Sequence, residues 1–338
     1  MLKLFNIFYI EIIRMRSSKM TNEDNKIPIK GYASFHPLKH CMIGRGFEPG
    51  HLKEFFPDPK ILNPMTRIAN ETEEDFLELE NIMKKAGVKT YRPALNMEKY
   101  ESPEKIYRPP ITPRDHFGVI GEKLYAVQYV QGYSEVLKQI PKENLVIRPA
   151  DKKFKSTIDT SRILRAGKDL YWGFDPSYGD PSTYVEMFKK DGFRVHLLER
   201  DYHIDAVLSL VKPRVAIALD EVQDYSKTLP GWEVLLIDDN PSVPFSSTKF
   251  KEYIRGRWWI KGEEHNETLA YFIDKWLSDW VGYVNESVFD VNMTSIDEHT
   301  VIVNNYNKKV FDFLAKHKIE PIIFNFRHRY SFQRWSNK

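Results

Sequence analysis

The chain has 338 residues, and its 50 lysines and arginines against 47 aspartates and glutamates give a formal net charge of +3. This near balance argues against a dedicated nucleic-acid-binding protein, which usually concentrates a basic excess on one face. The single cysteine excludes an intrachain disulfide and any zinc or iron–sulfur site built from cysteines, and it favours a reducing, cytoplasmic compartment. With 42% hydrophobic residues, the composition is typical of a compact globular protein.

Residues 1–28 predict an extension that precedes the folded domain. The apolar run from Leu4 to Ile13 is shorter than the roughly 20 residues that a membrane-spanning helix needs. Arginines follow this run where a secretory signal would need small residues, so we expect no membrane partner. The preferred interpretation is that translation starts at Met20. The alternative is a short amphipathic lead that packs on the domain.

One pattern recurs along the rest of the chain: an amphipathic helix ends in lysine or glycine, and a short β-branched or aromatic strand follows. These strands begin near Val88, Leu145, Phe193, Trp232 and Ile319. Apolar runs split by a turn precede the last four strands, at 117–127, 161–173, 207–219 and 293–305, and each run predicts a β-hairpin. The glycines at 87, 192 and 231 fit chain reversals between elements.

The repeated unit is therefore strand, turn, strand, helix, strand, and it is used about five times. Its irregular spacing excludes a strict solenoid. Five such units closing on an axis predict a single α/β propeller domain over 29–338, with strand ends converging at the centre. Polar residues at those ends are the first place to look for chemistry.

An insertion near 241–283 separates the last two units. The spacing of Tyr271, Phe272, Trp276 and Trp280 fits one face of a helix. A tryptophan-rich segment could form a binding surface, but large aromatic side chains are more often part of a core. We therefore expect this face to be buried on the body of the domain.

Polar residues gather at the edges of three predicted strands. Two successive prolines hold the chain extended and deliver Arg114, Asp115 and His116 just before a hairpin. His203 and Asp205 are two residues apart and so share one face of an emerging strand. The third cluster lies in the segment TIDTSRILRAGKDLYW. A histidine beside a carboxylate can act as an acid or base next to a group that holds a cationic substrate.

Several stretches resemble the arginine:glycine amidinotransferases of the pentein superfamily: TPRD, LRAGKDLY, HIDAVLSLV, and the closing IDEHTVIVN and IEPIIFNFRH. Their order and rough spacing match from about Ile29 to Arg329. The resemblance implies a five-bladed propeller of ββαβ units, in agreement with the repeat count. It also implies transfer of an amidino group from arginine to an amine acceptor such as glycine, with no metal or organic cofactor.

The resemblance also implies roles for individual residues. In that family a cysteine attacks the guanidinium carbon, a histidine moves protons, and aspartates hold the planar guanidinium. By position, Asp115 and Asp205 match substrate-holding aspartates and His203 matches the general acid/base. The alternatives are that Asp115 is a helix-cap or turn aspartate and that His203 and Asp205 are a solvated pair; the matching context favours the roles that the resemblance implies.

The sequence departs from the family pattern at the aspartate that orients the catalytic histidine. Ser161 or Arg162 occupies that position, and Asp159 is the nearest carboxylate. An arginine there would place a cation in a pocket meant for a guanidinium. Like charges about 4 Å apart cost on the order of 4 kcal/mol at an intermediate dielectric, which would oppose arginine binding.

The second departure concerns the nucleophile. The family carries its cysteine on a glycine-rich loop near the C-terminus, where this sequence continues SFQRWSNK. Cys41 lies in the first predicted strand beside apolar neighbours, which favours a buried, inert thiol. Ser331 and Ser336 lack a positioned base and an oxyanion-stabilising loop.

Two interpretations of the missing nucleophile remain open. In one, the last residues come from a shifted or prematurely ended reading frame. In the other, the protein is a non-catalytic pentein that binds a guanidino ligand or a protein partner. In both we expect no amidinotransferase turnover from this chain and no nucleic-acid partner. The sequence leaves a homodimer open.

Overall fold

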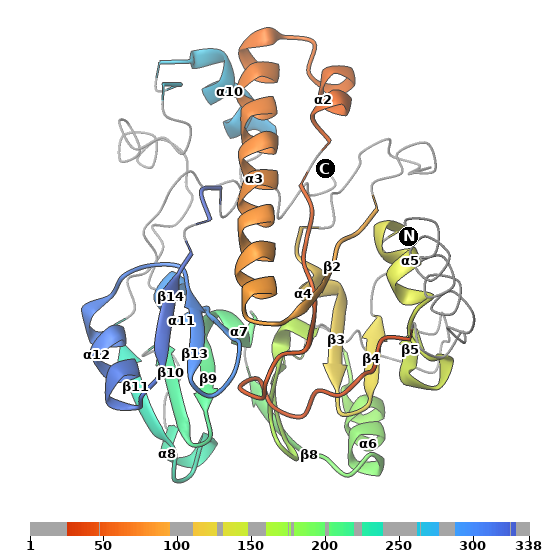
Figure 1. Cartoon of the computed structure of the whole chain (residues 1–338), viewed down its shortest axis with the longest axis vertical. Coiled ribbons are helices and arrows are strands. Elements are labelled where there is room, and N and C mark those ends of the chain that lie inside the picture. Colours follow the sequence, from red (N-terminus) through yellow and green to blue (C-terminus); the bar gives the residue numbers. More distant parts are fainter. Residues whose placement is uncertain are drawn as a thin grey trace, which may run out of the picture.

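A computed structural model gives the fold of the chain (Figure 1). The structure describes residues 26–46, 48–94, 111–126, 131–147, 160–174, 176, 179–199, 203–219, 225–238, 262–263, 265–276, 288–324 and 326–328. Within these residues the strands form five small sheets, one of two strands and four of three strands. None of the helices in these ranges is both long enough and apolar enough to cross a membrane.

The four three-stranded sheets share one plan. In each, the first two strands form an antiparallel hairpin and the third strand pairs in parallel with the second. The strands are β3 (Phe117–Ile120), β4 (Lys123–Ala126), β5 (Leu145–Ile147), β6 (Ile163–Ala166), β7 (Asp169–Phe174), β8 (Arg194–Glu199), β9 (Leu208–Lys212), β10 (Val215–Leu219), β11 (Glu233–Ile237), β12 (Thr294–Ser295), β13 (Thr300–Val303) and β14 (Glu320–Ile323). This plan confirms the hairpins and the unit predicted from the repeats.

A helix connects the second and third strands of each of these sheets. The helices are α5 (Ser134–Leu137), α6 (Ser182–Lys190), α8 (Tyr225–Thr228) and α12 (Lys308–Lys316). Two 3-10 turns flank α5, η2 (Gln131–Tyr133) and η3 (Lys142–Asn144). Gly192 and Gly231 reverse the chain with φ angles of +83° and +77°, in the left-handed region that favours glycine. The predicted role of these glycines is therefore confirmed.

The first unit is built differently. Its strands β1 (His40–Met42) and β2 (Lys89–Tyr91) pair in parallel, and α2 (Pro49–Phe55) and α3 (Pro59–Lys85) connect them. The 27-residue helix α3 rises far beyond the sheets, with α2 and α10 (Glu267–Trp276) beside its distal part (Figure 1). This unit thus adds a long helical arm to the four three-stranded sheets.

Helix α10 belongs to the insertion predicted near 241–283. Phe272 packs edge-to-face on Phe56, with ring centroids 5.2 Å apart, and Leu269 is fully buried. Tyr271 is 64% exposed, so the expectation that it shares the buried face was wrong. Successive helical residues are about 100° apart, and the buried face is set by the spacing of Leu269 and Phe272 instead. Trp280 and most of the insertion lie outside the described residues.

The segment 26–38 runs across several sheets and ties them together. Its backbone N–H groups donate to carbonyl groups of three units, at 2.7 to 3.1 Å: Ile27 to Gln139, Gly31 to Gly121, Ser34 to Arg165 and Leu38 to Ile296. Strand β10 is buried along its whole length and lies in the largest apolar cluster, which spans the last three sheets. The predicted N-terminal extension 1–28 lies outside the described residues except for its last three.

Candidate functional site

Four short helical turns each precede the first strand of a hairpin. They are α4 (Pro113–His116), the 3-10 turn η4 (Thr160–Arg162), α7 (Ile204–Val207) and α11 (Val288–Val291). Contacts link α4 to η4, η4 to α7 and α7 to α11. The polar clusters found at the predicted strand edges therefore lie on neighbouring turns at the starts of these hairpins.

Arg114 joins three of these segments through its side chain and backbone. Its Nε–H donates to Oδ2 of Asp205 at 3.2 Å, although the two residues are 91 positions apart. Its Nη2 donates to the carbonyl oxygen of Ile163 at 2.8 Å, and its own carbonyl accepts from Oγ1 of Thr160 at 2.7 Å. The site thus already holds one guanidinium group, supplied by the protein itself.

The structure brings the chain around Asp115 close to Asp205. Asp115 lies in α4 beside Arg114, and its side chain is outside the described parts of the structure. His203 is half-buried, and its carbonyl oxygen accepts from the N–H of Ala206 at 3.2 Å, at the start of α7. The Asp205 side chain is 21% exposed. The roles that the resemblance implies for Asp115, His203 and Asp205 stay predictions.

Two further arginines lie on the elements next to this contact, Arg162 in η4 and Arg165 in β6. Arg162 is buried in η4, at one of the two positions where the resemblance led us to expect an aspartate. Nη1 of Arg165 donates to the carbonyl oxygen of Val119 at 2.6 Å, and burial, together with the nearby Arg114, lowers the pKa of Arg165 to about 9. Asp159 lies outside the described residues. The ion pair of Arg114 with Asp205 defines the candidate site.

The cysteine is not part of this site. Cys41 lies in β1, as predicted, and packs against the apolar cluster that contains Ile43, Phe76 and Met83. Burial raises the pKa of its thiol to about 11. Because the thiolate is the nucleophilic form, this environment suppresses cysteine chemistry at neutral pH. Ser331 and Ser336 lie outside the described residues.

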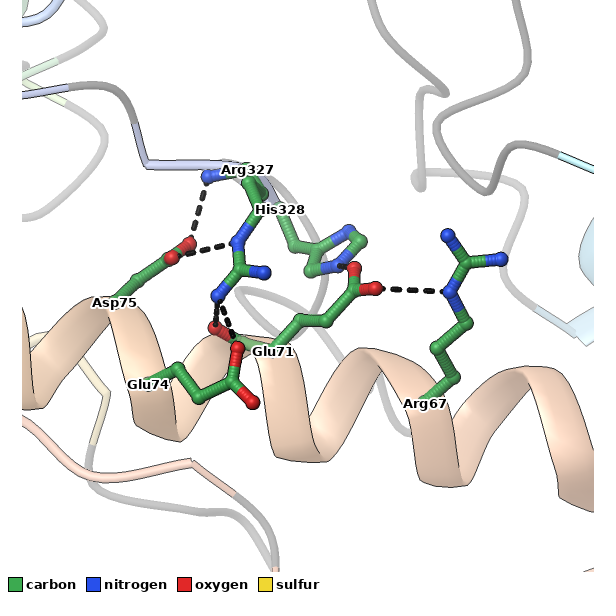
Figure 2. A network of polar contacts seen from close by, with 6 residues as sticks. All are labelled: Arg67, Glu71, Glu74, Asp75, Arg327 and His328. Carbon is green, nitrogen blue, oxygen red and sulfur yellow. Dashed lines mark hydrogen bonds and ion pairs between the residues drawn. The ribbon is translucent and has the colours of Figure 1, made fainter.

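A network of charges fixes the chain just after β14 to the middle of α3 (Figure 2). Both the backbone N–H and Nε–H of Arg327 donate to the carboxylate of Asp75 at 2.7 Å. Nη2 of Arg327 donates to the carbonyl of Glu71 and to the carboxylate of Glu74, both at 2.8 Å. Nε2 of His328 lies 2.6 Å from Oε2 of Glu71. Sequence reasoning missed this network because its two halves lie more than 250 positions apart.

Burying these charges is costly unless each one is paired, so the network fixes which residues of the two segments lie together. The Asp75 side chain is 4% exposed, and burial raises its pKa despite the hydrogen bonds from Arg327. An unpaired charge at this depth would be strongly destabilising, so the pairing dictates where the chain leaves β14. The acidic run ETEEDFLELE was the signal in the sequence. Within the described residues, no group of histidine, cysteine and acidic side chains could hold a metal ion.

No family model matches the sequence, and no curated protein matches it. The fold is similar to solved amidinotransferases. One is SxtG of the saxitoxin biosynthetic pathway from Microseira wollei, with a TM-score of 0.60 and 17% identity over 91% of this chain and 94% of that one. The inosamine-phosphate amidinotransferase StrB1 from Streptomyces griseus gives a TM-score of 0.62 and 14% identity over 90% and 93% of the two chains.

The chain has the pentein fold. A more distant structure with this fold, DDAH from Pseudomonas aeruginosa complexed with citrulline, gives a TM-score of 0.51 and 12% identity over 88% of this chain and 95% of that chain. The fold expected from the resemblance is therefore confirmed, because these likenesses extend over nearly the whole chain.

Proposed function

We propose that this pentein binds a small guanidino ligand such as arginine where α4, η4 and α7 meet. The contact between Arg114 and Asp205 carries the proposal. It shows that the Asp205 carboxylate and the Ile163 carbonyl can accept hydrogen bonds from two N–H groups of one guanidinium. A guanidinium has five N–H donors in a planar fork and pairs well with such acceptors. Two amidinotransferases with the same fold support a ligand of this chemistry, and so does a DDAH that was solved in complex with citrulline.

A ligand has to compete with Arg114 for Asp205. The two side chains are 37% and 21% exposed, so they remain partly hydrated. Ion pairs in such surroundings contribute about 0–1 kcal/mol, which a well-placed ligand can offset. Asp115 then provides a second carboxylate, and His203 the acid/base group that the resemblance implies.

Binding does not lead to amidino transfer in this proposal. The family reaction needs a thiolate, and the sequence offers one cysteine, Cys41, with a pKa near 11. At pH 7 such a thiol is ionised in about one molecule in ten thousand. The chain therefore acts as a guanidino-binding protein without a thiol nucleophile. Release of ornithine from arginine by the Cys41→Ser variant would contradict this.

Calorimetry with L-arginine tests the binding. The wild-type chain should give a saturable heat, and Asp205→Asn should lower the affinity at least about tenfold, because a charge-assisted hydrogen bond is lost. Asp191→Asn is the matched control, since it removes a carboxylate paired with Lys123 on another part of the propeller. The proposal is wrong if the wild type gives no heat, or if both variants bind alike.

A further inference from the structure

A cavity of about 570 Å³ lies at the other ends of the strands that begin at the guanidino site. Strands β6 and β9 start next to η4 and α7, and the turns that follow them, at Gly167 and Arg214, line this cavity. Strands of four and five residues separate the two sites by about 13–16 Å. The cavity is thus distinct from the proposed guanidino site.

The cavity lining is cationic. Arg194, Arg214 and Lys227 contribute three permanent cations, and Asp169 is the one carboxylate among the lining residues that the structure describes. Arg194 donates to both oxygens of Asp169, at 2.7 and 2.6 Å, and His196 contacts the same carboxylate at 2.8 Å. The hydrogen bond from Arg194 lowers the pKa of Asp169, which keeps this carboxylate ionised and paired. Arg214 adds a second guanidinium group to the lining, and a guanidinium pairs well with an anionic group such as a phosphate.

Two aromatic rings in the lining are supported from behind. The His196 ring stacks on buried Tyr171, with centroids 5.0 Å apart and an interplanar angle of 17°, and its side chain is 43% exposed. Half-buried Trp232 rests against Phe35, with centroids 6.5 Å apart. Rings held in this way offer flat surfaces at a low entropic cost, and they suit a planar aromatic group.

We propose that this cavity binds a nucleoside monophosphate. The cations at Arg194, Arg214 and Lys227 attract the phosphate, and the rings of His196 and Trp232 pack against the base. The volume lies within the range of about 300–1,000 Å³ that is usual for small-molecule sites. Arg214 has a φ of +64°, which is uncommon for a residue with a side chain and is consistent with a functional turn.

Calorimetry of the full chain with AMP, ribose 5-phosphate and inorganic phosphate tests this proposal. AMP should bind at least about tenfold more tightly than ribose 5-phosphate, because only AMP carries a ring that can stack. Its affinity should fall as salt is raised, since the cations are partly exposed. The proposal is overturned if AMP gives no heat, or if ribose 5-phosphate or inorganic phosphate binds as tightly as AMP.

Variants locate the site. Arg214→Ala and Lys227→Ala should each weaken AMP binding about tenfold, and Trp232→Leu should weaken AMP without affecting ribose 5-phosphate. Lys138→Ala is the matched control, because Lys138 is an exposed lysine of another sheet unit. Wild-type AMP affinity in both Arg214→Ala and Lys227→Ala, with melting curves that show folded protein, overturns the assignment. Asp205→Asn should leave AMP binding intact, so this proposal and the guanidino proposal can fail separately.

Discussion

At the scale of single residues, Arg114 occupies the place that a ligand would take in the proposed guanidino site. Arg114 supplies the guanidinium that Asp205 and the Ile163 carbonyl hold. A ligand has to compete with this internal group. Its observed affinity falls as the fraction of molecules in which Arg114 is paired with Asp205 rises. Arg114 is therefore the residue that sets how strongly the site binds.

Replacing Arg114 by alanine should raise the affinity for arginine. The internal pair contributes about 0–1 kcal/mol, so freeing Asp205 should strengthen binding by up to about fivefold. Arg114→Lys keeps the charge near Asp205 and should bind like the wild type. Calorimetry with L-arginine measures both variants, after melting curves have shown that each is folded. Weaker binding in Arg114→Ala would mean that Arg114 contacts the ligand rather than competing with it.

At the scale of elements, α3 and α10 are joined at the point where proline interrupts a helix. Pro64 lies inside α3 and has no N–H to donate to the carbonyl oxygen of Lys60. Nδ2 of Asn266 donates to that oxygen at 2.7 Å. Oδ1 of the same side chain accepts from the N–H of Leu269 at 3.0 Å and caps α10. Asn266 therefore supplies the missing hydrogen bond to the Lys60 carbonyl of α3 and caps the first turn of α10.

Asn266→Ala should lower the free energy of unfolding by about 1–2 kcal/mol, because it removes both a cap and a hydrogen bond. Asn266→Asp keeps the cap acceptor but cannot donate to Lys60, so it isolates the second interaction. Pro64→Ala restores an N–H that can donate to the Lys60 carbonyl. In that background, Asn266→Ala should therefore cost less free energy of unfolding than it does in the wild type. A double-mutant cycle by urea unfolding measures this coupling. Strict additivity would contradict the proposed link.

These elements also show how far the sequence could lead. Hairpins and chain reversals are local, so the turn-split apolar runs and glycines such as Gly192 predicted them correctly. The length of α3 was not predictable, because Pro64 reads as a helix end and its compensating donor, Asn266, is 206 positions away from Lys60. The convergence of the polar clusters followed from the propeller. The ion pair of Arg114 with Asp205 did not, since a motif fixes neighbours along the chain and not partners across it.

At the scale of the whole molecule, segment 26–38 connects three sheet units through backbone hydrogen bonds. At Gly31, its N–H and carbonyl both pair with Gly121, at 2.7 and 2.9 Å. The buried guanidinium of Arg165 lies directly beneath this crossing. The crossing therefore joins the unit of β3–β5 to that of β6–β8, and it needs a residue without a side chain.

Gly31→Ala should destabilise the whole molecule by about 1–3 kcal/mol through overpacking. A Cβ at this position would lie 2.7 Å from Cγ1 of Val119 and would press on Nη1 of Arg165, which is buried and has little freedom to move. Gly50→Ala is the matched control, because nothing lies within 4 Å of its added Cβ and alanine is the better helix former in α2. Urea unfolding followed by circular dichroism should give Gly31→Ala a lower free energy of unfolding than the wild type. Gly50→Ala should have a free energy of unfolding equal to or higher than that of the wild type. Equal stability of the two variants would mean that the sheets are held together without this crossing.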